Sequence, residues 1–82
     1  MNRDEIKSCV IRNLTRIAPD VDENALEPAV NFRDQFDFDS MDFLNFIIAV
    51  YKELKIEIPE ADYPQMLNLD SSVNYLATKL SL

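Results

Sequence analysis

The chain has 82 residues, which is enough for one domain with a single modest core. Fifteen acidic residues against eight basic ones give a net charge of −7, which argues against binding to nucleic acid and favours partners with basic surfaces. With no histidine and one cysteine, metal sites built on these ligands are excluded, and the absence of glycine excludes glycine-rich phosphate loops.

The N-terminal residues, Met1 to Glu5, contain no basic segment followed by an apolar one, so no secretory signal is expected. The chain has no run of about 18 apolar residues, and we therefore expect no insertion into a membrane. The single cysteine cannot form an internal disulfide, which suits a reducing cytoplasm. A cytoplasmic protein is expected.

Because the chain has no glycine, any turn that needs a positive φ is expected at asparagine or aspartate.

A first helix is predicted from Asn2, which can cap it, to the residues before Pro19, which ends it. Its apolar residues recur at helical spacing. They are Ile6, Cys9, Val10, Leu14 and Ile17. Because free cysteine is among the most buried residue types, Cys9 is expected to be a small core residue.

Residues 18–39 form a long predicted connection with Pro28 near its middle and a possible short turn at 26–30. It carries regularly placed apolar residues, so we expect it to be packed against the core. These are Val21, Leu26, Val30, Phe32, Phe36 and Phe38.

A second helix is predicted to begin at Asp39 or Ser40 and to end near Lys55. It has two apolar faces. The stripe assigned to the core consists of Phe43, Phe46, Ile47, Val50 and Leu54. The opposite face holds Met41, Leu44 and Ile48, and in so small a domain we expect these three to form an exposed patch for partners.

The rest of the chain predicts two further helices. Ile56-Glu57-Ile58 alternates like a strand but has no partner strand, so it is assigned to a loop. A short helix is predicted within 60–66, beginning late enough to place Pro64 in its first turn. Asn68 caps a last helix, whose apolar face consists of Leu69, Val73, Leu76 and Leu80. The predicted fold is all-α: one domain over residues 1–82, forming a small four-helix bundle. Three helices are longer and one is short, and a long loop joins helices 1 and 2.

Ser40 stands at the start of the most apolar helix, where unpaired backbone N–H groups favour an anion. A nucleophilic serine needs a base, and the chain has no histidine, so self-contained acyl transfer is not expected. The segment 37–39 opens like a calcium loop but lacks the required glycine and terminal glutamate. For an isolated Asp-Ser pair before an apolar run, a simple helix cap is the ordinary interpretation.

The neighbouring residues favour a different interpretation. Asp39-Ser40-Met41, after a packed loop and at the head of the second helix, resembles the Asp-Ser-Leu signature of the acyl carrier protein family. The resemblance covers about residues 3–80. Downstream it is carried by the Ile58-Pro59 pair, by Glu60 and Asp62, and by Asn68, Leu69 and Val73-Asn74-Tyr75-Leu76.

The resemblance implies that a phosphopantetheinyl transferase joins 4′-phosphopantetheine from coenzyme A to Ser40, with Asp39 and Met41 framing the site. The thiol of that arm would hold acyl groups as thioesters, and acyl-loading and acyl-processing enzymes of fatty-acid, polyketide or related synthesis would be partners. Such a chain is a carrier rather than an enzyme, and a monomer is expected. The partner-binding residues implied are Asp42, Leu44, Asn45, Ile48 and Lys52.

Two departures from the family pattern suggest a specialised carrier. Asp37 stands where glycine is common, and Asn45, Tyr51 and Lys52 stand where acidic residues are often found. Two alternatives stay open. One is an unmodified adaptor that binds partners through Met41, Leu44 and Ile48, and the other is an aminoacyl carrier of the D-alanyl or peptidyl type.

Overall fold

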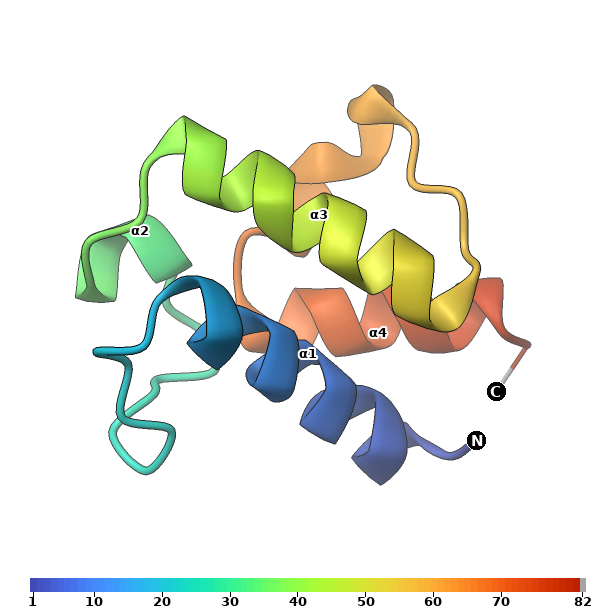
Figure 1. Ribbon diagram of the computed structural model, residues 1–82. Coiled ribbons are helices and arrows are strands. Elements are labelled where there is room, and N and C mark those ends of the chain that lie inside the picture. The colour runs from blue at the N-terminus through green and yellow to red at the C-terminus, as the bar shows by residue number, and fades with distance from the viewer. Residues whose placement is uncertain (82) are drawn as a thin grey trace.

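The computed structural model describes residues 1–81, which form five helical segments and no strand. They are α1 (Arg3–Ile17), α2 (Phe32–Gln35), α3 (Ser40–Leu54), the 3₁₀ helix η1 (Glu60–Met66) and α4 (Leu69–Lys79). Figure 1 shows that α1 runs antiparallel to α3 and α4, and α1 packs against both. The predicted all-α bundle is confirmed.

Side-chain caps explain where the three long helices begin. Asn2 and Glu5 form a capping box at α1, in which each side chain accepts from the other residue's backbone N–H at 2.9 Å. Asp39 and Asp42 form the same motif at α3. At α4 the Asn68 side chain accepts from Ser71 N at 2.8 Å. These polar side chains satisfy N–H groups that would otherwise lack a partner inside the helix.

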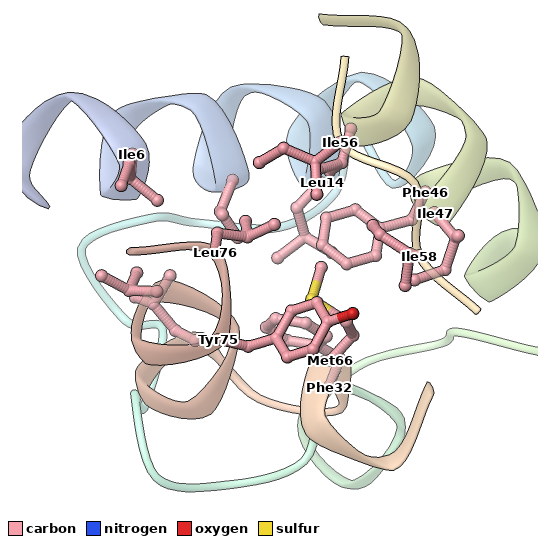
Figure 2. Close-up of a cluster of buried hydrophobic side chains, with 14 of the residues drawn as sticks. Ile6, Leu14, Phe32, Phe46, Ile47, Ile56, Ile58, Met66, Tyr75 and Leu76 are labelled. Carbon is pink, nitrogen blue, oxygen red and sulfur yellow. The ribbon is translucent and has the colours of Figure 1, made fainter. Parts of the chain in front are cut away.

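One continuous apolar core joins all five segments, and Figure 2 shows its centre. Each of the three long helices contributes the stripe predicted from its spacing, and Cys9 is fully buried as expected. Phe43 and Leu54, assigned to the core of α3, are only half-buried and pack at its edge. The largest fully buried side chains are Ile6, Leu14, Phe32, Phe46, Met66 and Leu76.

The connection between α1 and α3 is packed down, but it is not a continuous loop. It contains α2, a helix of four residues that the sequence pattern did not predict. Two backbone hydrogen bonds tie this region to the far end of the chain: Phe32 N donates to Leu67 O at 2.8 Å, and Asp70 N donates to Pro28 O at 3.0 Å. The Gln35 side chain also bridges the backbone of Glu27 and Val30. The connection is therefore held by contacts distant in sequence.

Two details of the prediction are wrong. The helix at η1 begins at Glu60, so Pro64 lies in its interior rather than in its first turn. A 3₁₀ helix tolerates this because it is short and its hydrogen-bond pattern is less demanding than that of an α-helix. The positive φ values fall on Lys55 (57°) and Ser81 (61°), not on asparagine or aspartate. Segment 55–59 is irregular, as predicted.

Candidate functional site

Ser40 is the first residue of α3 and is exposed. The capping role belongs to Asp39, whose Oδ1 accepts from Asp42 N at 2.8 Å while Asp42 Oδ2 accepts from Asp39 N at 3.3 Å. Within residues 1–81, no hydrogen bond uses the Ser40 hydroxyl. The simple-cap interpretation therefore fits Asp39, and the serine hydroxyl is left without a structural task.

A small cavity of about 100 Å³ opens beside Ser40. Its lining is mainly aromatic and aliphatic, with one cation at its edge. The lining residues are Phe32, Arg33, Phe38, Asp39, Ser40, Phe43 and Leu67.

Edge-to-face aromatic packing fixes the cavity wall. The ring centroids of Phe32 and Phe38 are 5.8 Å apart, and those of Phe38 and Phe43 are 6.4 Å apart. Phe43 in turn meets Tyr63 of η1 at 5.6 Å. Such T-shaped pairs stabilise a defined arrangement beyond their apolar burial. The start of α3 is thereby held against α2 on one side and η1 on the other.

The outer face of α3 carries the predicted patch. Met41 is 62% exposed, Leu44 39% and Ile48 42%, so these apolar side chains face solvent. Tyr51 continues the same stripe at 49% exposure. Tyr51 was not predicted to belong to this patch, although its spacing of three residues from Ile48 places it on the same face of the helix.

The polar residues predicted to bind partners fall into two groups. Asn45 and Lys52 are exposed and line a shallow groove between α1 and α3 together with Ile48 and Arg16. Asp42 is half-buried and engaged in the cap of α3, close to Ser40. The structure thus brings Asp39, Ser40, Met41 and Asp42 together at the helix start, and places the remaining predicted residues along the helix.

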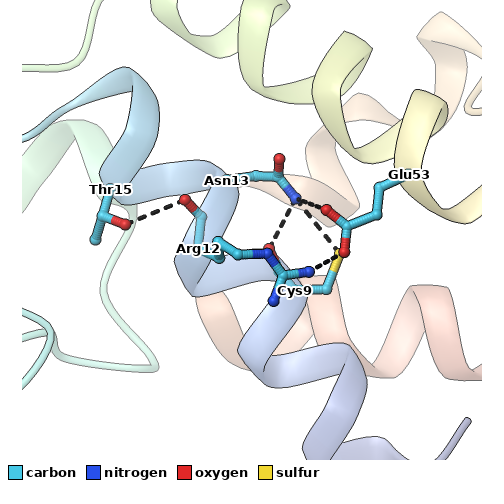
Figure 3. A network of polar contacts seen from close by, with 5 residues as sticks. All are labelled: Cys9, Arg12, Asn13, Thr15 and Glu53. Carbon is cyan, nitrogen blue, oxygen red and sulfur yellow. Dashed lines mark hydrogen bonds and ion pairs between the residues drawn. The ribbon is translucent and has the colours of Figure 1, made fainter.

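A second polar cluster joins α1 to the other end of α3, as Figure 3 shows. Asn13 donates to the Cys9 carbonyl oxygen at 2.8 Å and to Glu53 Oε1 at 3.2 Å, while Arg12 forms an ion pair with Glu53. Burial, together with the neighbouring Glu53 carboxylate, raises the pKa of the Cys9 thiol to about 11. A thiol held protonated in this way is a poor nucleophile.

Arg33 is the one charged residue lining the cavity that sequence reasoning missed entirely. It lies in a segment predicted to be a loop, next to the buried Phe32, and no periodic pattern marks it.

Within residues 1–81 no helix combines the length and apolar character needed to cross a bilayer.

Comparison with known proteins agrees with this geometry. The family model described as "Phosphopantetheine attachment site" matches residues 4–76, a range that includes Ser40 and the whole cavity. A curated acyl carrier protein from Picosynechococcus sp. is 30% identical over 76 residues, covering 93% of this chain and 88% of the relative.

Two further curated relatives are also named acyl carrier protein. One, from Rubrobacter xylanophilus, is 28% identical and covers 93% of both chains. The other, from Campylobacter jejuni, is 26% identical and covers 89% of this chain and 88% of the relative. The chain therefore belongs to the acyl carrier protein family, whose members are carriers rather than enzymes and bear a covalently attached 4′-phosphopantetheine.

Proposed function

We propose that Ser40 is the residue to which 4′-phosphopantetheine is attached, within one acyl-carrier domain spanning residues 1–82. The observation that carries the proposal is an exposed hydroxyl with no other role, placed at the start of α3 because Asp39 takes the cap. The helix start stabilises a phosphate, since its first N–H groups and its dipole both favour negative charge. Asp39 and Met41 flank the attachment point.

The loading reaction balances without a catalytic group from this chain. The Ser40 oxygen forms a bond to the phosphorus of the phosphopantetheine half of coenzyme A. The bond from that phosphorus to 3′,5′-adenosine bisphosphate breaks, and the hydroxyl proton passes to a base on a phosphopantetheinyl transferase with bound magnesium. The residues of this chain contribute position and access, which agrees with the lack of histidine.

The arm supplies a terminal thiol that carries an acyl group as a thioester. In this proposal the chain shuttles acyl intermediates among enzymes of fatty-acid, polyketide or related lipid biosynthesis in the cytoplasm. It acts as a monomer that neither inserts into membranes nor binds nucleic acid. We infer a specialised carrier because the outer face of α3 presents Asn45, Tyr51 and Lys52 at positions where acidic residues are often found in the family.

Loading on Ser40 is tested by intact mass. With coenzyme A, magnesium and a transferase, the wild-type protein is expected to gain the mass of one phosphopantetheine, and Ser40→Ala is expected to gain nothing. Ser8→Ala removes a hydroxyl from another exposed helical serine and should load normally. Far-ultraviolet circular dichroism establishes that both variants are folded. A Ser40→Ala protein that still gains the mass would overturn the proposal.

The outer face of α3 is proposed as the docking surface, formed by Asp42, Leu44, Asn45, Ile48 and Lys52. Exposed apolar side chains at the centre of an interface typically dominate its energy. Ile48→Asp is therefore expected to raise the transferase KM for the unmodified protein about tenfold, the effect of losing roughly 1.4 kcal/mol. Ala29→Asp adds the same charge to an exposed position outside α3 and should leave KM unchanged. Equal KM values for both variants would contradict this assignment.

The exposed stripe also supports a second candidate, an adaptor that is never modified and binds partners through Met41, Leu44 and Ile48. Intact mass of the protein isolated from its own cells separates the two: the carrier shows the adduct, and the adaptor does not. An aminoacyl carrier would share the attachment chemistry, and the mass of its thioester cargo would identify it.

A further inference from the structure

Arg33 lies on α2 and lines the cavity that also contains Ser40. It is exposed, and it is the only basic residue among those that line this cavity. Four acidic residues lie close by in sequence: Asp34, Asp37, Asp39 and Asp42. The site therefore combines a concentration of negative charge with a single cation at its edge.

Nothing else in the described part of the chain occupies the Arg33 side chain. The ion pairs within residues 1–81 are those of Arg12 with Glu53 and of Lys79 with Asp62. No side-chain hydrogen bond in that range involves the Arg33 guanidinium. Because Arg33 pairs with no carboxylate in that range, its five N–H donors are available.

The backbone that carries Arg33 is nevertheless firmly placed. The preceding residue, Phe32, is buried and packs against Phe38 and Phe46 with centroid distances of 5.8 and 5.6 Å. Its backbone N–H bonds to Leu67 O at 2.8 Å, and Phe36 N donates to Phe32 O at 3.2 Å. The short segment thus presents one long, unpaired cationic side chain at a fixed point beside the serine.

Resting on the proposed attachment to Ser40, we propose that Arg33 is the cationic partner of the phosphodiester once the arm is in place. The guanidinium holds the phosphate at the rim of the cavity and so sets the direction in which the arm leaves the protein. Arg33 is a positioning residue and takes no part in the chemistry of thioester formation.

The charge balance of the site favours this role. Attachment adds one negative charge beside Asp37, Asp39 and Asp42, and like charges at close range repel one another. The start of α3 offsets only part of that repulsion, because its capping box already uses two of the N–H groups. A planar guanidinium matches a phosphate with two parallel hydrogen bonds, which a lysine ammonium cannot reproduce.

The test compares the loaded and unloaded forms of Arg33→Gln with those of the wild type. At low ionic strength, Arg33→Gln is expected to lower the Tm of the loaded protein about 2–4 °C further than that of the unloaded protein, the size expected for an exposed ion pair in a domain this small. The extra loss should disappear in 1 M NaCl, where the screening length is about 3 Å. Transverse relaxation of the ³¹P resonance should also slow in the variant, because the phosphate gains freedom.

Two further variants complete the design. Arg16→Gln removes the same charge from an exposed position on α1, outside this cavity, and should change the Tm of both forms equally. Arg33→Lys keeps the charge without the paired geometry and should retain part of the effect. If Arg33→Gln changes both forms equally and leaves ³¹P relaxation unaltered, Arg33 has no such role, although Ser40 still carries the arm. If the wild type never gains the mass, the attachment proposal fails, and this inference fails with it.

Discussion

Glu53 ties the end of α3 to α1 through a few directed contacts. Partial burial acts to raise the pKa of its carboxyl, but hydrogen bonds from Cys9 and Asn13, together with the charge of Arg12, lower it overall. The carboxylate is therefore more stable in the folded chain than in the unfolded one. Nothing in the sequence pairs these residues, because they are distant in the chain and meet only when α1 packs on α3.

This coupling predicts a pH dependence. A group whose pKa is lowered by folding stabilises the folded state at any pH above its pKa in the unfolded chain. That contribution is lost as the pH falls through its pKa in the folded chain. For Glu53 the loss should therefore occur below its ordinary value of 4.5. Glu53→Gln should reduce stability at pH 7 by less than about 1 kcal/mol, as is typical for exposed pairs, and should flatten the decline at acid pH.

Urea unfolding between pH 3 and 7 measures this difference. Glu57→Gln is the matched control, because Glu57 is exposed and lies outside the contacts between α1 and α3. If the stability of the Glu53→Gln variant declines at acid pH as steeply as that of the wild type, other carboxylates are responsible.

At the scale of the element, α3 is well defined at its start and strained at its end. Its last residue is followed by Lys55, which adopts a left-handed conformation with φ 57° and ψ 35°. Glycine usually occupies this position because it lacks the Cβ that causes the steric penalty. This chain contains no glycine, so a side chain bears the cost.

Lys55→Gly is accordingly expected to raise the free energy of unfolding by about 0.5–1 kcal/mol, after the added freedom of the unfolded chain is subtracted from the relief of strain. Lys52→Gly makes the same exchange within the helix and should lower it by roughly 1 kcal/mol. Chemical denaturation of both variants checks the opposite signs. A destabilised Lys55→Gly protein would indicate that the lysine side chain makes a stabilising contact that outweighs the strain.

Helices with an apolar stripe and a polar cap could be predicted closely from the sequence. Asn2, Asp39 and Asn68 mark the starts of α1, α3 and α4 as expected. The short segments could not be predicted in the same way. α2 is too short to show a period, and η1 follows a 3₁₀ pattern in which Pro64 is tolerated.

For the whole molecule, the class of fold and the exposed patch on α3 could be predicted from local patterns in the sequence. The cavity beside Ser40 could not. The cavity beside Ser40 exists because the backbone of Phe32 bonds to Leu67 and that of Pro28 to Asp70. These contacts join segments that lie far apart in the chain, and no local spacing encodes them. Arg33 reaches the site only through this long-range arrangement, which explains why its place beside Ser40 was not anticipated.

The burial of Cys9 has a practical consequence for following the cargo. It is the only cysteine in the chain, it is inaccessible to solvent, and its raised pKa keeps it protonated at neutral pH. Electrophilic dyes such as maleimides react with accessible thiolates. In the native protein they would therefore label only the terminal thiol of the arm. The fluorescence would then report the fraction of molecules whose arm is attached and carries no acyl group.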